Sequence, residues 1–302
     1  MRYAYYPGCS LTATAKEYDT STRALCARLG ITLEEIPDWT CCGASAVEPV
    51  SQLLTHVLPA RNLALAEGLD ENEGVLIPCS ACYLNHLRVE MEDAPVPERK
   101  RRVNTVLAEE DLVYDGDHPV VVHLLEVLGR PEILETLTTE TTSPLNGLRI
   151  APYYGCQILR PFARFDDPEI PTSMEPILRG VGAEIHPWRL GNACCGASLM
   201  TTHKEVALHN VGRILHSAQG ADAVVTVCPM CQLNLEGFQK NALHRFPDDE
   251  PLPILYLPQL IGLALGLTPG EVQLNKNLHA GEFVHGLAGL VPEKQPEADA
   301  VS

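Results

Sequence analysis

Basic residues are scarce in this chain. It has 22 Lys and Arg against 39 Asp and Glu, which gives a formal net charge of −17 over 302 residues. Nucleic acids and anionic membranes bind clustered Lys and Arg, so this balance argues against both as partners. A membrane span is not expected either, because the longest apolar run, residues 252–267, is interrupted by Pro253 and Pro258 and is shorter than the roughly 20 residues required.

Leader and cofactor motifs are missing as well. The N-terminus runs directly into an apolar, strand-like segment with no basic region before it, so no secretory signal is visible and a cytoplasmic location is expected. There is no G-x-G-x-x-G for a flavin or nicotinamide and no C-x2-C-x2-C-x3-C ferredoxin run. Electrons that this chain handles must therefore arrive from, or leave to, another polypeptide.

Cysteine is abundant and regularly placed. Ten of the eleven cysteines follow one pattern used twice, C-x31-CC-x36-C-x2-C and then C-x37-CC-x32-C-x2-C. In a reducing compartment such thiols are metal ligands or catalytic groups rather than a disulfide framework. The first cysteine set is Cys9, Cys41, Cys42, Cys79 and Cys82, and the second cysteine set is Cys156, Cys194, Cys195, Cys228 and Cys231.

Short strands alternate with helices in both halves. The patterns predict strands at 2–6, 32–36, 74–78 and 120–123, and helices at 16–29, 44–67, from 80, 98–110 and 124–129. The order repeats with strands at 148–153, 184–187, 223–227 and 253–257, and helices at 172–181, 199–219, 230–243 and 259–265. This predicts an α/β protein of two similar halves, each a small, mostly parallel sheet of about four strands covered by helices, related by internal duplication.

A stretch rich in Thr and Ser at 137–147 has no periodicity and is interpreted as a linker. We therefore expect a first half at 1–140, a second half at 147–290 and a disordered tail at 291–302. The length allows two cores of about 140 residues each.

The predicted fold places the cysteines on one edge. In each half, cysteines follow the first three strands, and the carboxyl ends of parallel strands form the ligand crevices of open α/β sheets. The neighbouring glycines and the N-termini of the following helices suit a bulky anionic cofactor.

Three kinds of site use such thiols. A structural zinc takes four ligands in a tetrahedron, whereas each half offers five thiols. Redox-active dithiols at the two C-x2-C motifs would leave six other cysteines without a role. An iron–sulfur cluster in each half would use all five thiols, the adjacent pair included. Clusters are favoured, and zinc in one or both halves and metal-free thiols are the alternatives.

At these residues the chain resembles the B-type component of heterodisulfide reductase, a family also called CCG-domain proteins, over residues 1–267. The resemblance implies one noncubane [4Fe–4S] cluster in each half, held by the first and second cysteine sets. It also implies that the two clusters face a shared cavity and split a disulfide between them. The implied partners are the ferredoxin-like and the flavin-bearing subunits of the complex. The second half departs from the pattern in its longer first spacer and shorter second spacer.

The expected function is the catalytic iron–sulfur subunit of a heterodisulfide-reductase-like complex, an oxidoreductase acting on a disulfide or thiol in either direction. Breaking a disulfide takes two electrons and a cluster ordinarily passes one, so two clusters fit one disulfide. The main alternative is an electron-relay subunit of a membrane-associated dehydrogenase of the succinate, lactate or glycolate type. A zinc-bound scaffold without activity is the third possibility.

Two residues outside the cysteine sets require separate interpretation. His123 ends the fourth predicted strand and could donate a proton to a departing thiolate, although the equivalent position in the second half is Tyr256. Cys26 lies among apolar residues of the first helix and is expected to be a small buried hydrophobe.

Overall fold

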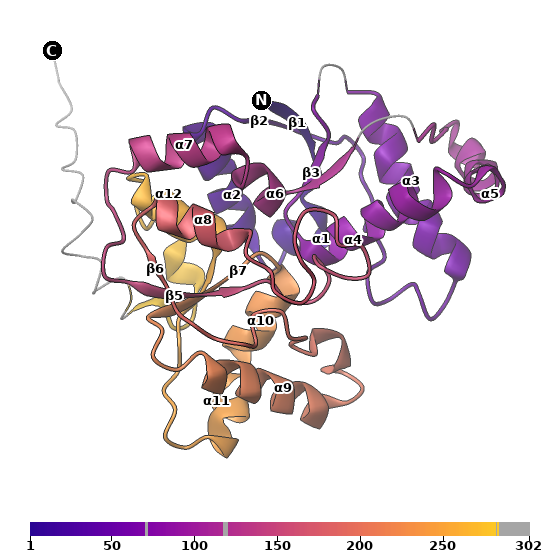
Figure 1. Ribbon diagram of the computed structural model, residues 1–302. Coiled ribbons are helices and arrows are strands. Elements are labelled where there is room, and N and C mark those ends of the chain that lie inside the picture. The colour runs from indigo at the N-terminus through magenta and orange to yellow at the C-terminus, as the bar shows by residue number, and fades with distance from the viewer. Residues whose placement is uncertain (70–71, 117–119, 282, 284–302) are drawn as a thin grey trace, which may run out of the picture.

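Two parallel sheets with the same strand order form the framework of the protein (Figure 1). The structure is a computed structural model that describes residues 1–69, 72–116, 120–281 and 283. The strand orders are β2-β1-β3-β4 and β6-β5-β7-β8, and neighbouring strands are parallel in both sheets. The predicted α/β fold of two similar halves, with four strands each, is confirmed.

The elements of the first half follow the predicted order. Its strands are β1 (Arg2–Tyr5), β2 (Thr32–Glu35), β3 (Val75–Ile77) and β4 (Val121–His123). Its helices are α1 (Gly8–Thr12), α2 (Lys16–Arg28), α3 (Gln52–Glu67), α4 (Ser80–Arg88), α5 (Pro97–Leu107), α6 (Leu124–Leu128) and α7 (Pro131–Glu140).

The second half repeats this arrangement. Its strands are β5 (Arg149–Tyr153), β6 (Glu184–Ile185), β7 (Ala223–Thr226) and β8 (Ile254–Tyr256). Its helices are α8 (Met174–Gly180), α9 (Lys204–Ser217), α10 (Pro229–Gly237), α11 (Gln239–Ala242) and α12 (Leu257–Ala264). Proline occupies the first turn of α5, α7 and α10, where its missing N–H has no intrahelical partner to lose.

Several helix bounds differ from the prediction. The helix expected at 44–67 begins only at Gln52, because turns follow Cys42 and the Ser51 hydroxyl caps α3 by accepting from the Leu54 N–H at 3.3 Å. The helix expected at 199–219 likewise begins at Lys204, after a 3₁₀ turn. The helix expected at 230–243 divides at Phe238 into α10 and α11.

The predicted linker at 137–147 is wrong at its start. Residues up to Glu140 belong to α7, because Leu137 is fully buried in the core. The threonines on this helix satisfy their hydroxyls locally, as Thr138 and Thr139 donate to the carbonyls four residues earlier. A run of Thr and Ser therefore does not exclude a helix when one face is apolar.

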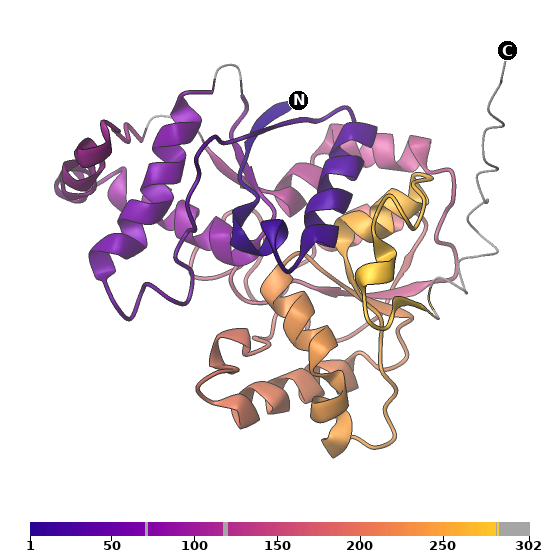
Figure 2. The same ribbon diagram turned by 180° about the vertical axis from the view of Figure 1, so that it is seen from behind.

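The hydrophobic core does not divide as the halves do. The larger cluster of buried side chains includes Tyr5 and Leu25 from the first half and Val225 and Leu260 from the second. Helix α2 packs along α12, and α7 packs along α8. Figure 2 shows α2 in indigo beside α12 in yellow. One core therefore joins both halves, and a smaller cluster lies under α9 and α10.

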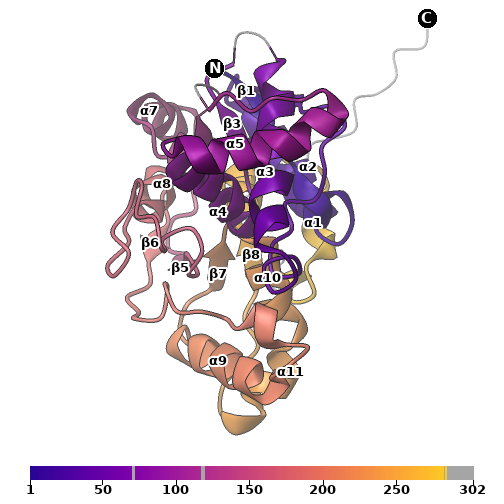
Figure 3. The same cartoon turned by 90° about the vertical axis from the view of Figure 1, so that its right-hand side faces the viewer.

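The shared core holds the two sheets in a fixed relation. Helices α3 and α5 lie at one end of the molecule and α9 and α11 at the other, with α1, α4 and α10 between them (Figure 3). The bounds of the two halves, 1–140 and 147–290, stay a prediction. The tail expected to be disordered, 291–302, lies outside the described residues.

Candidate functional site

The first cysteine set lies at the carboxyl ends of β1, β2 and β3. Its thiols meet in pairs, with 3.7 Å between the Sγ atoms of Cys9 and Cys41 and 3.3 Å between those of Cys42 and Cys82. Cys79 occupies the N-cap position of α4. Cys9 and Cys41 are exposed, whereas the other three are buried, so the set extends from the surface to the interior.

The second cysteine set has the same arrangement. The Sγ atoms of Cys195 and Cys231 lie 3.5 Å apart, and the thiols of Cys156 and Cys194 are hydrogen-bonded. Cys228 occupies the N-cap position of α10, as Cys79 does in α4, and neither thiol makes a capping hydrogen bond. Cys194 is exposed, Cys156 is half-buried and the remaining three are buried. Each half therefore carries an outer and an inner thiol pair at equivalent positions.

The two sets meet where the halves join. The thiols of Cys79 and Cys228 interact across this junction, which raises the pKa of Cys79 and lowers that of Cys228, and the two residues are only 2% and 1% exposed. Helix α1 packs against α10 at this junction. Thiol contacts run from Cys9 through Cys41, Cys42, Cys82, Cys79, Cys228 and Cys231 to Cys195, and Cys194, next in the chain, continues to Cys156. The ten cysteines thus form one line from the exposed Cys9 to the half-buried Cys156, which lies beside the exposed Cys194.

Two glycines allow the backbone to pass beside the inner thiols. Gly8 has φ +73°, and a Cβ there would lie 3.1 Å from the Cys82 Sγ. Gly155 has φ +69°, and its Cβ would lie 3.2 Å from the Cys231 Sγ. Both the left-handed conformation and the close approach require glycine.

Side chains that the sequence patterns did not indicate hold the adjacent-cysteine loops. The Tyr6 hydroxyl donates to the Thr40 carbonyl at 2.8 Å, and the Tyr153 hydroxyl donates to that of Ala193 at 2.6 Å, just before each pair. The amide of Asn85 donates to the Cys42 carbonyl at 2.9 Å, and that of Asn234 donates to the Cys195 carbonyl at 2.8 Å. The repeated pattern C-x2-C-x2-N was the available signal for both asparagines.

Alanine in place of Asn85 or Asn234 is expected to lower the free energy of unfolding by about 1–3 kcal/mol, because a buried carbonyl loses its donor. The loop should also loosen, so the thiol of Cys42 or Cys195 should react faster with an alkylating reagent, as measured by mass spectrometry. Asn104→Ala is the control, since Asn104 on α5 makes two comparable bonds, to the carbonyl and the N–H of Tyr114. Equal alkylation rates in all three variants would contradict the clamping role.

Hydrogen bonds between thiols separate their pKa values. Bonds with Cys42 and Cys9 lower the pKa of Cys41, and the bond with Cys156 lowers the pKa of Cys194 to about 6. Bonds with Cys231 and Cys79 lower the pKa of Cys228. The pKa is thus lowered for one thiol of the first cysteine set, Cys41, and for two of the second, Cys194 and Cys228, and a lowered pKa favours the thiolate, which is the form that binds metals.

His123 and Cys26, which lie outside the cysteine sets, are both fully buried. His123 caps α6, its Nδ1 accepts from the Leu125 N–H at 3.0 Å, and burial lowers its pKa to about 3. Its role as a proton donor stays a prediction. Tyr256 ends β8 as His123 ends β4, in agreement with the expected equivalence. Cys26 is packed in the core, which confirms its interpretation as a buried hydrophobe.

The arrangement of the thiols distinguishes a site for a single metal ion from a site for an iron–sulfur cluster. Among residues 1–69, 72–116, 120–281 and 283, no three His, Cys, Asp or Glu side chains converge closely enough to hold a single metal ion. Five thiols that meet in pairs fit a cluster, whose irons take separate ligands, better than a tetrahedral zinc. A search of the same residues finds no helix with the length and apolarity needed to cross a membrane.

Comparison with known proteins identifies relatives in two kinds of reductase. The chain is 38% identical over 281 residues to the 8-methylmenaquinol:fumarate reductase membrane anchor subunit of Wolinella succinogenes, covering 91% of this chain and 96% of the relative. It is 27% identical over 285 residues to the B-type component of the Ferredoxin/F(420)H(2)-dependent CoB-CoM heterodisulfide reductase of Methanosarcina acetivorans, covering 91% and 93%.

A solved structure and a family model complete the comparison. A hypothetical protein from Helicobacter pylori has the same fold, with a TM-score of 0.71 and 17% identity over 92% of this chain. This chain spans about half of that protein, 52% of its length. The cysteine-rich (CCG) domain model matches residues 3–86 and 150–236, one match in each half. The duplicated site and these matches together show that the chain belongs to the CCG cysteine-rich domain family.

Proposed function

We propose that this chain is the iron–sulfur subunit of a multi-subunit oxidoreductase and that each half holds one [4Fe–4S] cluster of the noncubane type. The observation that carries the proposal is the line of ten thiols, with Cys79 and Cys228 in contact at its centre. The first cysteine set would hold one cluster and the second cysteine set the other. Bound clusters supply one-electron transfer, because iron–sulfur centres exchange electrons singly.

The other residues of the site would keep this arrangement fixed and dry. Tyr6 and Asn85, with Tyr153 and Asn234 in the second half, hold the adjacent-cysteine loops by their carbonyls. The inner thiols are buried, whereas the outer ones reach the surface. Partner proteins would therefore exchange electrons at the outer ends. The proposed partners are one ferredoxin-like and one flavin-bearing protein of the same complex, since the chain has no flavin motif of its own.

The proposed reaction is reduction or formation of a disulfide, in a cytoplasmic complex. A disulfide takes up two electrons, and two one-electron sites held by neighbouring residues, Cys79 on one side and Cys228 on the other, would be suited to deliver them together. The relative from heterodisulfide reductase, at 27% identity over most of both chains, supports this class of substrate.

Electron relay is the second candidate, and the relative at 38% identity favours it. In that case the chain would pass electrons between a quinol and a partner that acts on fumarate or succinate, in a complex held at a membrane by other means. The line of thiols also suits this role, because it connects the exposed Cys9 and Cys41 to the exposed Cys194 through the interior.

Metal analysis of anaerobically purified protein tests the common part of the proposal. We expect about eight irons per chain, four in each cluster. Stoichiometric zinc without iron after anaerobic reconstitution would overturn it. To separate the two candidates, the tagged chain is purified with its partners and assayed for viologen-dependent disulfide reduction and for menaquinol oxidation by fumarate. Activity in only one assay selects the reaction.

A further inference from the structure

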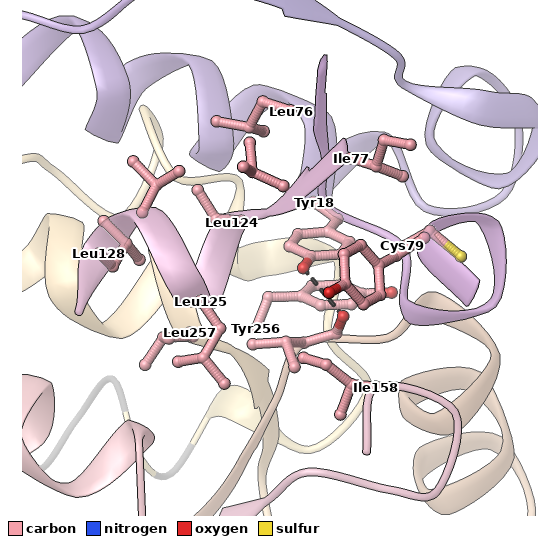
Figure 4. Close-up of a cluster of buried hydrophobic side chains, with 14 of the residues drawn as sticks. Tyr18, Leu76, Ile77, Cys79, Leu124, Leu125, Leu128, Ile158, Tyr256 and Leu257 are labelled. Atoms are coloured by element: carbon pink, nitrogen blue, oxygen red, sulfur yellow. Dashed lines mark hydrogen bonds between the residues drawn. The ribbon is translucent and has the colours of Figure 1, made fainter. Parts of the chain in front are cut away.

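Tyr18 of α2 lies between the two halves and is fully buried (Figure 4). Its hydroxyl oxygen is 2.7 Å from the carbonyl oxygen of Pro78 and 3.1 Å from that of Val227. These residues immediately precede Cys79 and Cys228. A single hydroxyl from the first half therefore bonds to the backbone of the central cysteine loop in each half.

The ring of Tyr18 is fixed as firmly as its hydroxyl. It stacks on Tyr256 of β8, with ring centroids 4.1 Å apart and planes inclined by 4°. The Tyr256 hydroxyl donates to the Gln232 Oε1 at 3.3 Å, which holds the partner ring in turn. Stacked aromatic pairs add stabilisation beyond the apolar area that they bury. Tyr18 thus has little freedom to move relative to the second half.

A second series of hydrogen bonds, through His123 and Ser80, reaches the Val227 carbonyl. The Nδ1 of His123 accepts from the Leu125 N–H, so the neutral ring carries its proton on Nε2, 3.4 Å from the Ser80 Oγ. The Ser80 hydroxyl then donates to the Val227 carbonyl at 3.1 Å. Val227 of the second half is therefore held by two donors from the first, in a buried region where such networks are strongly directional.

We infer that Tyr18 is the positioning residue that sets the separation of Cys79 and Cys228, and with it the coupling between the two metal centres. This inference rests on the proposed function, because the coupling exists only when both halves hold clusters. Each half supplies one side of the junction, and Tyr18 is the side chain whose hydroxyl bonds to both sides. Ser80 is the secondary link, which acts on Val227.

The test is Tyr18→Phe in the full chain, loaded anaerobically with iron and sulfide. The substitution keeps the ring and its stack but removes the hydroxyl. At a potential where both clusters are paramagnetic, we expect the splitting from their magnetic interaction to be lost while the iron content stays at the wild-type level. Ser80→Ala should weaken the splitting less than Tyr18→Phe does. If Tyr18→Phe does not fold, the splitting is measured in Ser80→Ala instead.

Tyr83→Phe is the matched control. Tyr83 is equally buried, and its hydroxyl has no hydrogen-bond partner in the part of the chain that the structure describes, so its removal should leave the splitting unchanged. Wild-type splitting in both Tyr18→Phe and Ser80→Ala, with full iron content, would overturn the role of Tyr18 and leave the proposed function standing. A wild-type chain that binds no iron would instead overturn the proposed function.

Discussion

Serine in place of any one of four cysteines is expected to abolish disulfide turnover to the same extent, on the order of 100-fold or more. In the proposed function each substitution would remove a ligand from one adjacent pair and so disable one of two one-electron sites, while the disulfide still requires two electrons. The measurement is disulfide reduction with an artificial electron donor, beside the spectroscopic signal of each cluster. The four positions are Cys41, Cys42, Cys194 and Cys195.

Cys26→Ala is the control for these substitutions. Cys26 is buried in α2 and belongs to neither cysteine set, so its loss should leave both clusters and the turnover in place. Full activity in a variant that lacks only the first-half cluster would refute the paired mechanism. Such a result would favour electron relay, in which one site is sufficient for transfer and the two halves need not be equal.

Alanine in place of Gly8 or Gly155 should remove the cluster of its own half and leave about four irons per chain instead of eight. The new Cβ would lie 3.1 Å from the Cys82 Sγ in one case and 3.2 Å from the Cys231 Sγ in the other. The thiol must then shift, and in Gly8→Ala the Tyr6 ring, also 3.1 Å from the new Cβ, must shift as well. The left-handed conformation costs a residue with a Cβ roughly 1–2 kcal/mol in addition. Iron content and thermal unfolding are the measurements.

Gly30→Ala separates the effect of backbone strain from the effect of contact with the thiol. Gly30 has φ +69°, nearly that of Gly8 and Gly155, but its Cβ would meet no heavy atom within 4 Å. It should therefore show the same backbone strain, with lower thermal stability and full iron content. Loss of iron in Gly30→Ala as well would mean that strain alone, rather than contact with the thiol, empties the sites.

The strands and the cysteine junctions were predictable because local patterns determine them. β3 is a short apolar run whose three residues are all buried, and Cys79 follows it after the single residue Pro78. Helix α1 was missed because five residues are too few to show a helical period. The region after Gly43 was predicted as helix, but Val47 packs over Gly43 and the chain turns before α3 begins.

The contacts across the halves were not predictable in the same way. Tyr18 bonds to Val227, a residue 209 positions away, and no spacing along one chain encodes that contact. The pairing of Cys79 with Cys228 has the same origin, since it depends on how α2 and α12 dock. Sequence patterns predicted two equivalent cysteine sets, and the packing of the halves brings the two sets together.

The packing of α2 against α12 also disfavours gene fission and the loss of either half during evolution. If the two halves were encoded as separate chains, each would expose an apolar helix face that now lies in the shared core. Apolar surface costs about 25 cal/mol per Å² when returned to water, and large exposed patches promote aggregation. Gene fission or the loss of one copy is therefore disfavoured on grounds of solubility alone. The two halves are expected to be inherited together.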